Sequence, residues 1–291
     1  MRLNKGLMIS AIALTGVLAL SGCTNSAEEA PEATVEEDVS FEAGTTMAEL
    51  NEAGKITIGT KFDQPLFGLV GPSGDPVGFD VEIGKLIAAK LGISADNIEW
   101  KETVSTNREP FIQSGEVDLV IATYTINDKR KEVVSFAGPY YEAGQDILVL
   151  EGNPENIEGP EDLEGVNVCS VSGSTSEANL AEYGAVVLPA TGYSDCLEPL
   201  RSGQVSAVST DNVILAGLAD QNEGEFEVVN NPFTKEPYGI GLALEDDVFR
   251  AWINDTLTDA YDDGDWAAAW ESTAGKVLDL PDPPAVDNYT R

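Results

Sequence analysis

Residues 118–130 read DLVIATYTINDKR, and this stretch changes character half-way along. Its apolar run, residues 119–121, is short and carries no polar side chain, which predicts a buried strand. Three polar residues then follow at alternate positions: Thr123, Thr125 and Asn127. The pattern therefore predicts a buried strand that ends in a polar loop.

The end of the same stretch predicts a site for a small anion. Asn127 is a favourable N-cap for a helix that starts at Asp128, and Arg130 falls in the first turn of that helix. Helix N-termini offer unpaired N–H groups and a partial positive charge. Thr123 and Thr125 add hydroxyl donors, and a guanidinium can bind a carboxylate through two parallel hydrogen bonds. The alternative is an ordinary strand-to-helix turn with a surface arginine.

Composition limits the partners of this chain. Its 291 residues predict one large domain or two modest ones. With 51 acidic and 16 basic residues, the net charge is −35. Nucleic acid and anionic membrane surfaces are poor partners, because phosphate contacts need lysine and arginine. The chain has no histidine, the commonest general base and the commonest metal ligand. We expect no metal site and no cofactor. The acidic surface is either an adaptation to high salt or ordinary solubility.

The N-terminus has the pattern of a secretion signal. Arg2 and Lys5 precede an apolar stretch, residues 7–20, which is too short for a normal membrane span. It ends in LSGC at residues 20–23, which resembles a bacterial lipobox and implies lipidation of Cys23; a plain cleaved signal is the alternative. We expect residues 1–23 to be a lipoprotein signal peptide. Residues 24–45 are acidic and lack lysine and arginine, which predicts a disordered tether.

From residue 46 onwards, strand and helix patterns alternate, which predicts an α/β fold. A strand at residues 55–59 leads into a loop that carries Lys61. A helix is expected before Gly92, and two more at residues 251–261 and 266–270, followed by a loose tail from residue 281.

The run GFDVEI at residues 78–83, followed after three residues by Ile87 and Ala88, resembles the signature of the extracellular solute-binding proteins that serve ABC importers of polar amino acids. Further segments match that family in order: SFAGPYY at 135–141, SGSTSE at 172–177, TDNVILAG at 210–217 and PYGIG at 237–241. Two segments, KFDQP at 61–65 and ATYTINDKRK at 122–131, together with the cysteines Cys169 and Cys196, resemble the glutamate-binding lipoproteins of Gram-positive actinobacteria.

The resemblance implies a two-lobed fold of the type II periplasmic-binding-protein kind, with the ligand between the lobes. Lobe 1 would take residues 46–140 and 239–291, and lobe 2 residues 146–236. Two hinge crossings, at residues 141–145 and 237–238, would join them.

The resemblance also implies a function and a site. The protein would be a monomeric, non-enzymatic lipoprotein on the outer face of a Gram-positive cytoplasmic membrane, touching the membrane only through its lipid. It would deliver an amino acid, L-glutamate first, to the permease subunits of an ABC transporter. Arg130, with Thr125 and Thr123, matches the residues that bind the ligand's α-carboxylate in this family. Ser174 and Thr175 would add donors from lobe 2, and Asp211 matches the acceptor of the ammonium group.

Lys61 and Arg108 would contact the ligand's side chain, because acidic-amino-acid binders of this family carry basic residues at these positions. Tyr193 aligns loosely with a further contact to that side chain. Glutamine or aspartate are alternative ligands. An enzyme on the same fold, such as a cyclohexadienyl dehydratase-like lyase, is a rival from another class, as is a sensor ectodomain.

Cys169 and Cys196 both fall in the proposed lobe 2. In an extracellular protein such a pair is expected to form a disulfide, and two free buried thiols are the alternative. A catalytic cysteine is not expected, since the chain has no histidine to activate it.

Overall fold

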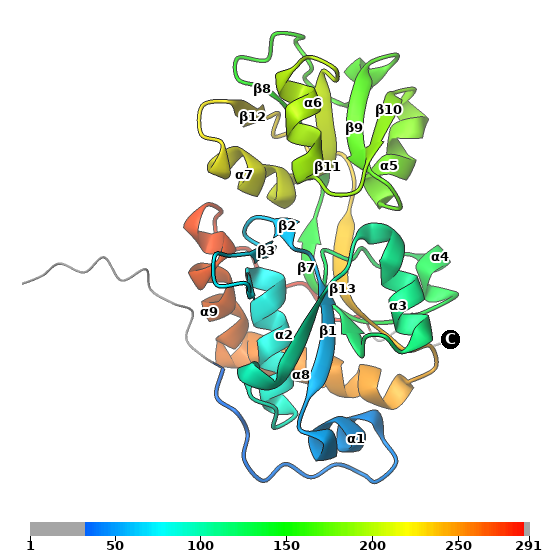
Figure 1. Cartoon of the computed structure of the whole chain (residues 1–291), viewed down its shortest axis with the longest axis vertical. Helices are drawn as coiled ribbons and strands as arrows, with labels where there is room; N and C mark the ends of the chain where they lie inside the picture. The colour runs from blue at the N-terminus through cyan, green and yellow to red at the C-terminus, as the bar shows by residue number, and fades with distance from the viewer. Residues whose placement is uncertain (1–32, 288–291) are drawn as a thin grey trace, which may run out of the picture.

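The computed structural model describes residues 33–287 and consists of two lobes, each built on a five-stranded sheet (Figure 1). The lobe 1 sheet has the order β5 (Ile98–Glu102), β1 (Ile56–Thr60), β6 (Leu119–Val120), β13 (Glu236–Leu242) and β7 (Ser135–Ala143). The lobe 2 sheet has the order β10 (Val186–Ala190), β9 (Asn167–Val171), β11 (Ala207–Asp211), β8 (Gln145–Leu150) and β12 (Phe226–Val228). The two-lobed α/β expectation is confirmed.

A small sheet and a set of helices complete lobe 1. The strands β2 (Asp63–Gln64), β3 (Gly68–Val70) and β4 (Pro76–Val77) form the small sheet, on the side of lobe 1 that faces lobe 2. The helices are α1 (Thr46–Ala53), α2 (Phe79–Lys90), α3 (Arg108–Ser114), α4 (Asp128–Lys131), α8 (Asp247–Asp263) and α9 (Asp265–Ser272). Helices α2, α8 and α9 pack on one another, whereas α3 packs on β6 and β13.

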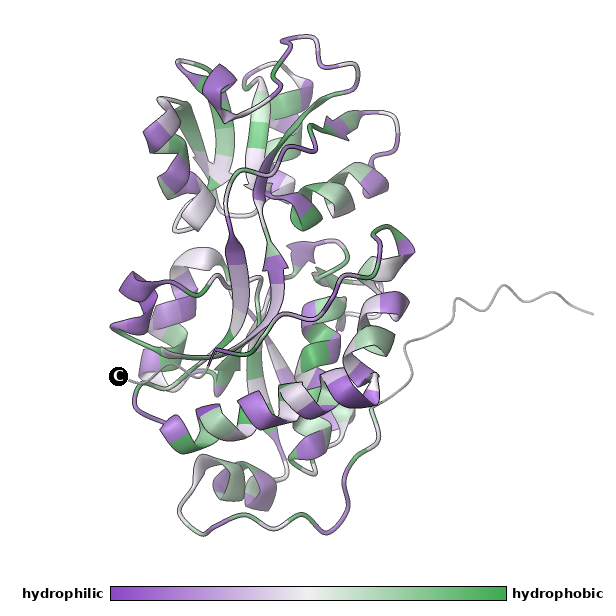
Figure 2. Ribbon diagram, turned by 180° about the vertical axis from the view of Figure 1, so that it is seen from behind, coloured by the Kyte–Doolittle hydropathy of each residue, from purple (hydrophilic) through white to green (hydrophobic). Residues whose placement is uncertain are grey.

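Lobe 2 carries three helices: α5 (Thr175–Leu180), α6 (Leu197–Arg201) and α7 (Asn212–Gln221). Cys169 on β9 is bonded to Cys196, which precedes α6, with their Cα atoms 5.6 Å apart. The expected disulfide is therefore confirmed, and it fixes α6 to the sheet. Buried apolar side chains pack between the sheets and the helices of both lobes, and the outward helix faces are polar (Figure 2).

Two chain crossings connect the lobes, and they lie side by side (Figures 1 and 2). The first runs from β7 into β8, and the second leads from β12 into β13. The two paths are paired, since Glu236 and Pro237 lie opposite Ala143 and Glu142. A paired two-stranded link of this kind lets the lobes rotate about it while each keeps its own sheet.

The two terminal segments lie closer to lobe 1 than the sequence suggests. Within the expected tether, Phe41 makes an edge contact with Trp252, and the Glu36 N–H donates to the Ala89 carbonyl. In the expected loose tail, the Asp287 N–H donates to the carbonyl of Gly138. One apolar side chain in each segment, Phe41 and Val286, is partly buried against the hydrophobic core. The expected signal peptide, Cys23 and residues 24–32 lie outside the described residues.

Candidate functional site

Polar side chains from both lobes surround a small cavity between them. Its walls include seven of the nine ligand-binding residues proposed from the sequence, all except Lys61 and Arg130, and several residues that the sequence did not single out. The lining residues are Gln64, Ser105, Arg108, Thr123, Thr125, Ser174, Thr175, Ser176, Tyr193, Thr210, Asp211 and Ile214. The cavity is small and almost entirely polar, which suits a compact ligand with several charged groups.

Arg108 is a buried cation on the cavity wall, with 3% of its surface exposed. It lies at the start of α3, and its guanidinium donates to the carbonyls of Ser105, Ala122 and Thr123 at 3.2–3.3 Å. Its charge also lies 4.4 Å from the centre of the Tyr124 ring. Burial and the nearby Arg130 lower the pKa of Arg108 to about 10. Among the described residues, no carboxylate forms an ion pair with it.

Lys61 does not line the cavity itself but lies behind Ser105, which does. It follows β1 and is only 3% exposed, and its Nζ donates to Ser105 Oγ at 2.9 Å. Burial, followed by repulsion from Arg108, lowers the pKa of Lys61 to about 7. The sequence predicted a direct contact between Lys61 and a ligand. In the structure Ser105 lines the cavity and Lys61 lies behind it, bonded to Ser105, so the contact of Lys61 with a ligand stays a prediction.

Asp80, from the signature helix α2, holds the polar loop in place from behind. Its carboxylate accepts from the Thr123 N–H at 2.8 Å and from the Tyr140 hydroxyl at 2.6 Å. Thr123 has a φ of +44°, which a non-glycine residue adopts only when neighbours fix it. Burial raises the pKa of Asp80 to about 7. The Thr123 N–H is thus used within lobe 1, and its hydroxyl donates to Gln64 at 2.9 Å.

Asp211 is the acidic group of the cavity. It lies at the end of β11 in lobe 2, and its Oδ2 accepts from the Tyr238 hydroxyl at 2.6 Å. Its other oxygen, Oδ1, is buried with no hydrogen-bond partner among the described residues. Burial, followed by the charge of Glu236, raises the pKa of Asp211 to about 7. An unpartnered carboxylate oxygen aimed at a polar cavity is an acceptor for a cationic group.

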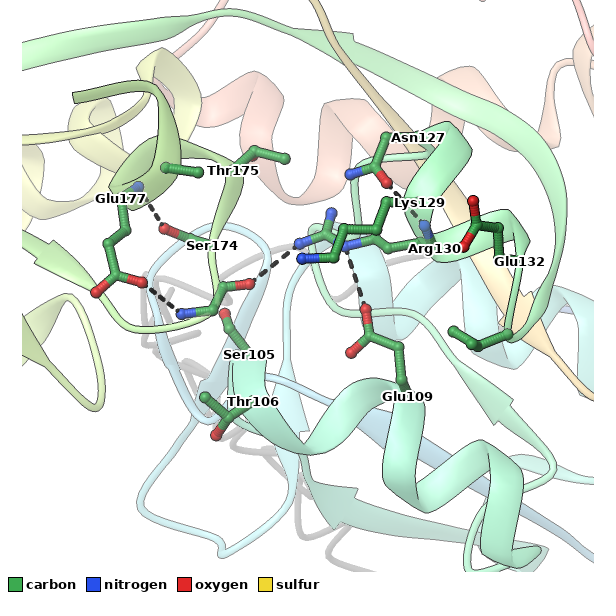
Figure 3. Close-up of a pocket in the computed structure, with 13 residues that line it drawn as sticks. Ser105, Thr106, Glu109, Asn127, Lys129, Arg130, Glu132, Ser174, Thr175 and Glu177 are labelled. Atoms are coloured by element: carbon green, nitrogen blue, oxygen red, sulfur yellow. Dashed lines mark hydrogen bonds and ion pairs between the residues drawn. The ribbon is translucent and has the colours of Figure 1, made fainter. Parts of the chain in front are cut away.

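Arg130 lies between the inner cavity and a larger, open pocket (Figure 3). Its guanidinium donates to the Thr125 carbonyl at 2.7 Å and, across the cleft, to the Gly173 carbonyl at 3.2 Å. Its Nε lies 3.2 Å from Glu109 Oε1. Arg130 is 7% exposed, so the alternative of a surface arginine is wrong. It lines the open pocket and not the inner cavity.

The expected helix at Asn127 is present but short. Asn127 caps it, since its side chain accepts from the Arg130 N–H at 2.9 Å. However, α4 spans only four residues, Asp128–Lys131. A single turn cannot build the dipole that the sequence suggested, so the positive charge of this loop comes from the Arg130 side chain.

The lobe 2 candidates divide between the cavity and internal bonds. Ser174 caps α5 by accepting from the Glu177 N–H at 2.9 Å. The Thr175 hydroxyl donates to Glu236 at 2.8 Å. Tyr193 is buried on the cavity wall. Sequence reasoning missed Gln64, although it lies in the quoted motif KFDQP, and Ser105, which precedes the proposed Arg108 by three residues. It also missed Glu236, because no local sequence pattern marks an acidic residue at the hinge.

The lobes are in contact on both sides of the cavity. A Cβ added at Gly173 would lie 3.0 Å from Thr106, and one at Gly217 would lie 2.7 Å from the Pro65 carbonyl oxygen. In both pairs the glycine belongs to lobe 2 and its neighbour to lobe 1. Together with the Arg130–Gly173 hydrogen bond, these contacts describe a closed arrangement of the lobes.

Comparison with known families is consistent with this architecture. Residues 56–273 match the model of the bacterial extracellular solute-binding proteins, family 3. The chain belongs to this family. The family binds amino acids and works with ABC transporter permeases.

Two relatives and one solved structure show the range of proteins with this fold. The glutamate-binding protein of Corynebacterium efficiens is 41% identical over 77% of this chain and 80% of its own length. The ABC transporter glutamine-binding protein of Bacillus subtilis is 40% identical over 75% and 81%. A structure of an ancestral amino acid-binding protein, a precursor of cyclohexadienyl dehydratase, is 30% identical, with a TM-score of 0.72, over 79% and 99%.

No group of three or more histidine, cysteine or acidic residues within residues 33–287 is arranged to hold a metal ion. No helix in the same range is long and apolar enough to cross a membrane.

Proposed function

We propose that this protein captures a free α-amino acid with an acidic side chain, L-glutamate first, between its two lobes and delivers it to an ABC permease. Lipidation at Cys23 would hold it at the outer face of the cytoplasmic membrane, and it would act as a monomer. Glutamine and aspartate are the alternative ligands, and the relatives bear names for both glutamate and glutamine.

One observation carries the choice of an acidic ligand. Lys61 and Arg108 are both buried in lobe 1 beside the cavity, and neither forms an ion pair with a described residue. Burying a charge away from water is costly unless a counter-charge is supplied. In a chain of net charge −35, basic residues are scarce and acids to pair with them are abundant. A ligand carboxylate would supply the missing counter-charge.

The other two groups of an α-amino acid also find partners. Asp211 Oδ1 lies across the cavity from lobe 1 and would accept from the ligand ammonium group. Arg130 lies at the outer side of the cavity and would grip the α-carboxylate, with Thr125 beside it. The carboxylate would compete with the Gly173 carbonyl for the Arg130 guanidinium, as a charged acceptor binds more strongly.

Ligand would favour the closed arrangement, because only closure brings these groups together. Arg108 and Arg130 belong to lobe 1, and Asp211 belongs to lobe 2. A ligand that contacts both lobes binds the closed state better than the open one and shifts the equilibrium towards it. The closed lobes would then dock on the permease.

A titration of the purified protein with each of the twenty amino acids in a calorimeter tests the proposal. We expect glutamate to bind most tightly, and Arg130→Ala to abolish binding of every α-amino acid that the wild type binds. Preference for a neutral or basic amino acid would reject the acidic ligand. The lyase alternative predicts product from prephenate or arogenate, and we expect none.

A further inference from the structure

The contacts of Lys61 are incomplete for a buried ammonium group. Its Nζ has three donor positions and one hydrogen-bond acceptor among the described residues, Ser105 Oγ at 2.9 Å. The charged groups that face it are Arg108 and Arg130, which repel it, and Asp63 and Asp80, which attract it. Neither acid is within ion-pair distance, so the charge of Lys61 is not balanced locally.

The hydrogen bond between Lys61 and Ser105 has a direction that matters for the ligand. An ammonium group can only donate, so Ser105 Oγ must accept from a charged Lys61. The Ser105 proton then has to point elsewhere, and no described residue accepts it. Ser105 lines the cavity. A charged Lys61 therefore makes this wall donate hydrogen bonds, which suits a carboxylate and not the NH₂ of an amide.

A neutral Lys61 reverses this preference. An uncharged amine carries a lone pair, so Ser105 can donate to Lys61 and accept from the ligand instead. The same wall then suits an amide. The charge of Lys61, acting through Ser105, sets which side chain the cavity prefers.

We propose that Lys61 is a charge switch: a side-chain carboxylate that enters the cavity draws one proton from the solvent onto the Lys61 amine, and the resulting ammonium holds the Ser105 hydroxyl towards that carboxylate. The inference rests on the proposed function, since it assumes that an acidic amino acid binds here. It adds to that function the uptake of one proton for each bound ligand whose side chain is a carboxylate.

The surroundings of Lys61 favour such a switch near neutral pH. Burial and Arg108 lower the pKa of Lys61 to about 7, so most of the lysine is neutral at pH 8. A carboxylate placed beside it favours the charged form and raises this pKa again. Glutamine brings no such charge. The ligand ammonium group also favours ionised Asp211, but that effect is common to both ligands and is small at pH 8, where this carboxyl is already ionised.

Calorimetry in two buffers measures the coupling directly. The titration is done at pH 8 in phosphate and in Tris, whose ionisation enthalpies differ, and the difference in observed heat gives the protons taken up. We expect glutamate to take up most of one proton more than glutamine at this pH, because Lys61 starts largely neutral. Equal proton uptake for two ligands that both bind would overturn the switch and leave the proposed function standing. Failure of glutamate to bind at all would reject the proposed function itself.

A matched variant isolates Lys61 from the other titrating groups. Lys61→Arg keeps the positive charge and the donors but cannot lose its proton in this pH range. We expect this variant to bind glutamate without the extra proton uptake, so its two buffer heats differ less than those of the wild type. Extra uptake that persists in Lys61→Arg would assign the proton to another group and overturn the proposal. The comparison needs glutamate alone, so it holds even where glutamine binds too weakly to titrate.

Discussion

Gly217 offers a direct test of whether this closed arrangement is the one that holds the ligand. It lies inside α7 of lobe 2, where its backbone is helical and alanine fits without strain. A Cβ there would lie 2.7 Å from the Pro65 carbonyl oxygen and 3.2 Å from Leu66, both in lobe 1. Gly217→Ala therefore clashes only when the lobes are closed.

The magnitude follows from opposing effects in the two states. In the open state, alanine in a helix interior stabilises lobe 2 by roughly 0.5–1 kcal/mol relative to glycine. In the closed state, the added methyl group costs about 1–3 kcal/mol, as overpacking does in tightly packed interiors. Only closure is penalised, so we expect ligand affinity to fall roughly 5- to 150-fold. Calorimetric titration measures the loss, and thermal unfolding without ligand measures the effect on the lobe.

Gly84→Ala is the matched control. A Cβ at Gly84 would also meet its nearest neighbour, the Trp100 ring, at 2.7 Å, but both residues belong to lobe 1. This variant should lower the free energy of unfolding, whereas Gly217→Ala should not. Wild-type affinity in Gly217→Ala would show that α7 does not reach Pro65 in the liganded protein, and the assignment of this arrangement to the ligand-holding state would be refuted.

Three further outcomes are expected. Arg108→Gln should weaken glutamate by about 2–5 kcal/mol, the usual loss for one partner of a buried charge pair, and glutamine far less; an equal loss for both would exclude Arg108 as the side-chain reader. The wild-type affinity for glutamine should rise with pH up to about 7 and then level off. Asp211, whose pKa is raised to about 7, must lose its proton before it can accept from the ligand's ammonium group. A flat affinity profile between pH 5 and 8 would contradict this role of Asp211. Replacing Cys169 and Cys196 together by serine should lower the free energy of unfolding by roughly 3–4 kcal/mol, and a denaturant titration with unchanged stability would count against it.

Local patterns were sufficient for the architecture. The α2 helix ends just before Gly92, which has a φ of +78°, and Asn127 caps α4, as the sequence predicts. Alternating strands and helices predicted the α/β class, and family motifs predicted two lobes. These features depend on neighbours in the chain, so one sequence carries enough information to find them. Helix length was harder: α4 stops after one turn, because β7 begins at Ser135.

The site was harder to predict, because its chemistry depends on contacts between distant segments. The sequence marked Lys61 as a cation near the ligand, but only the fold shows that Ser105, 44 residues later, stands between them. Similarly, Asp80 reaches the Thr123 N–H across 43 residues. Both contacts use groups that a motif counts as free donors or charges. A motif can therefore assign a residue to the site while leaving open whether it touches the ligand or acts through another side chain, and for Lys61 that distinction decides whether its own proton is part of binding.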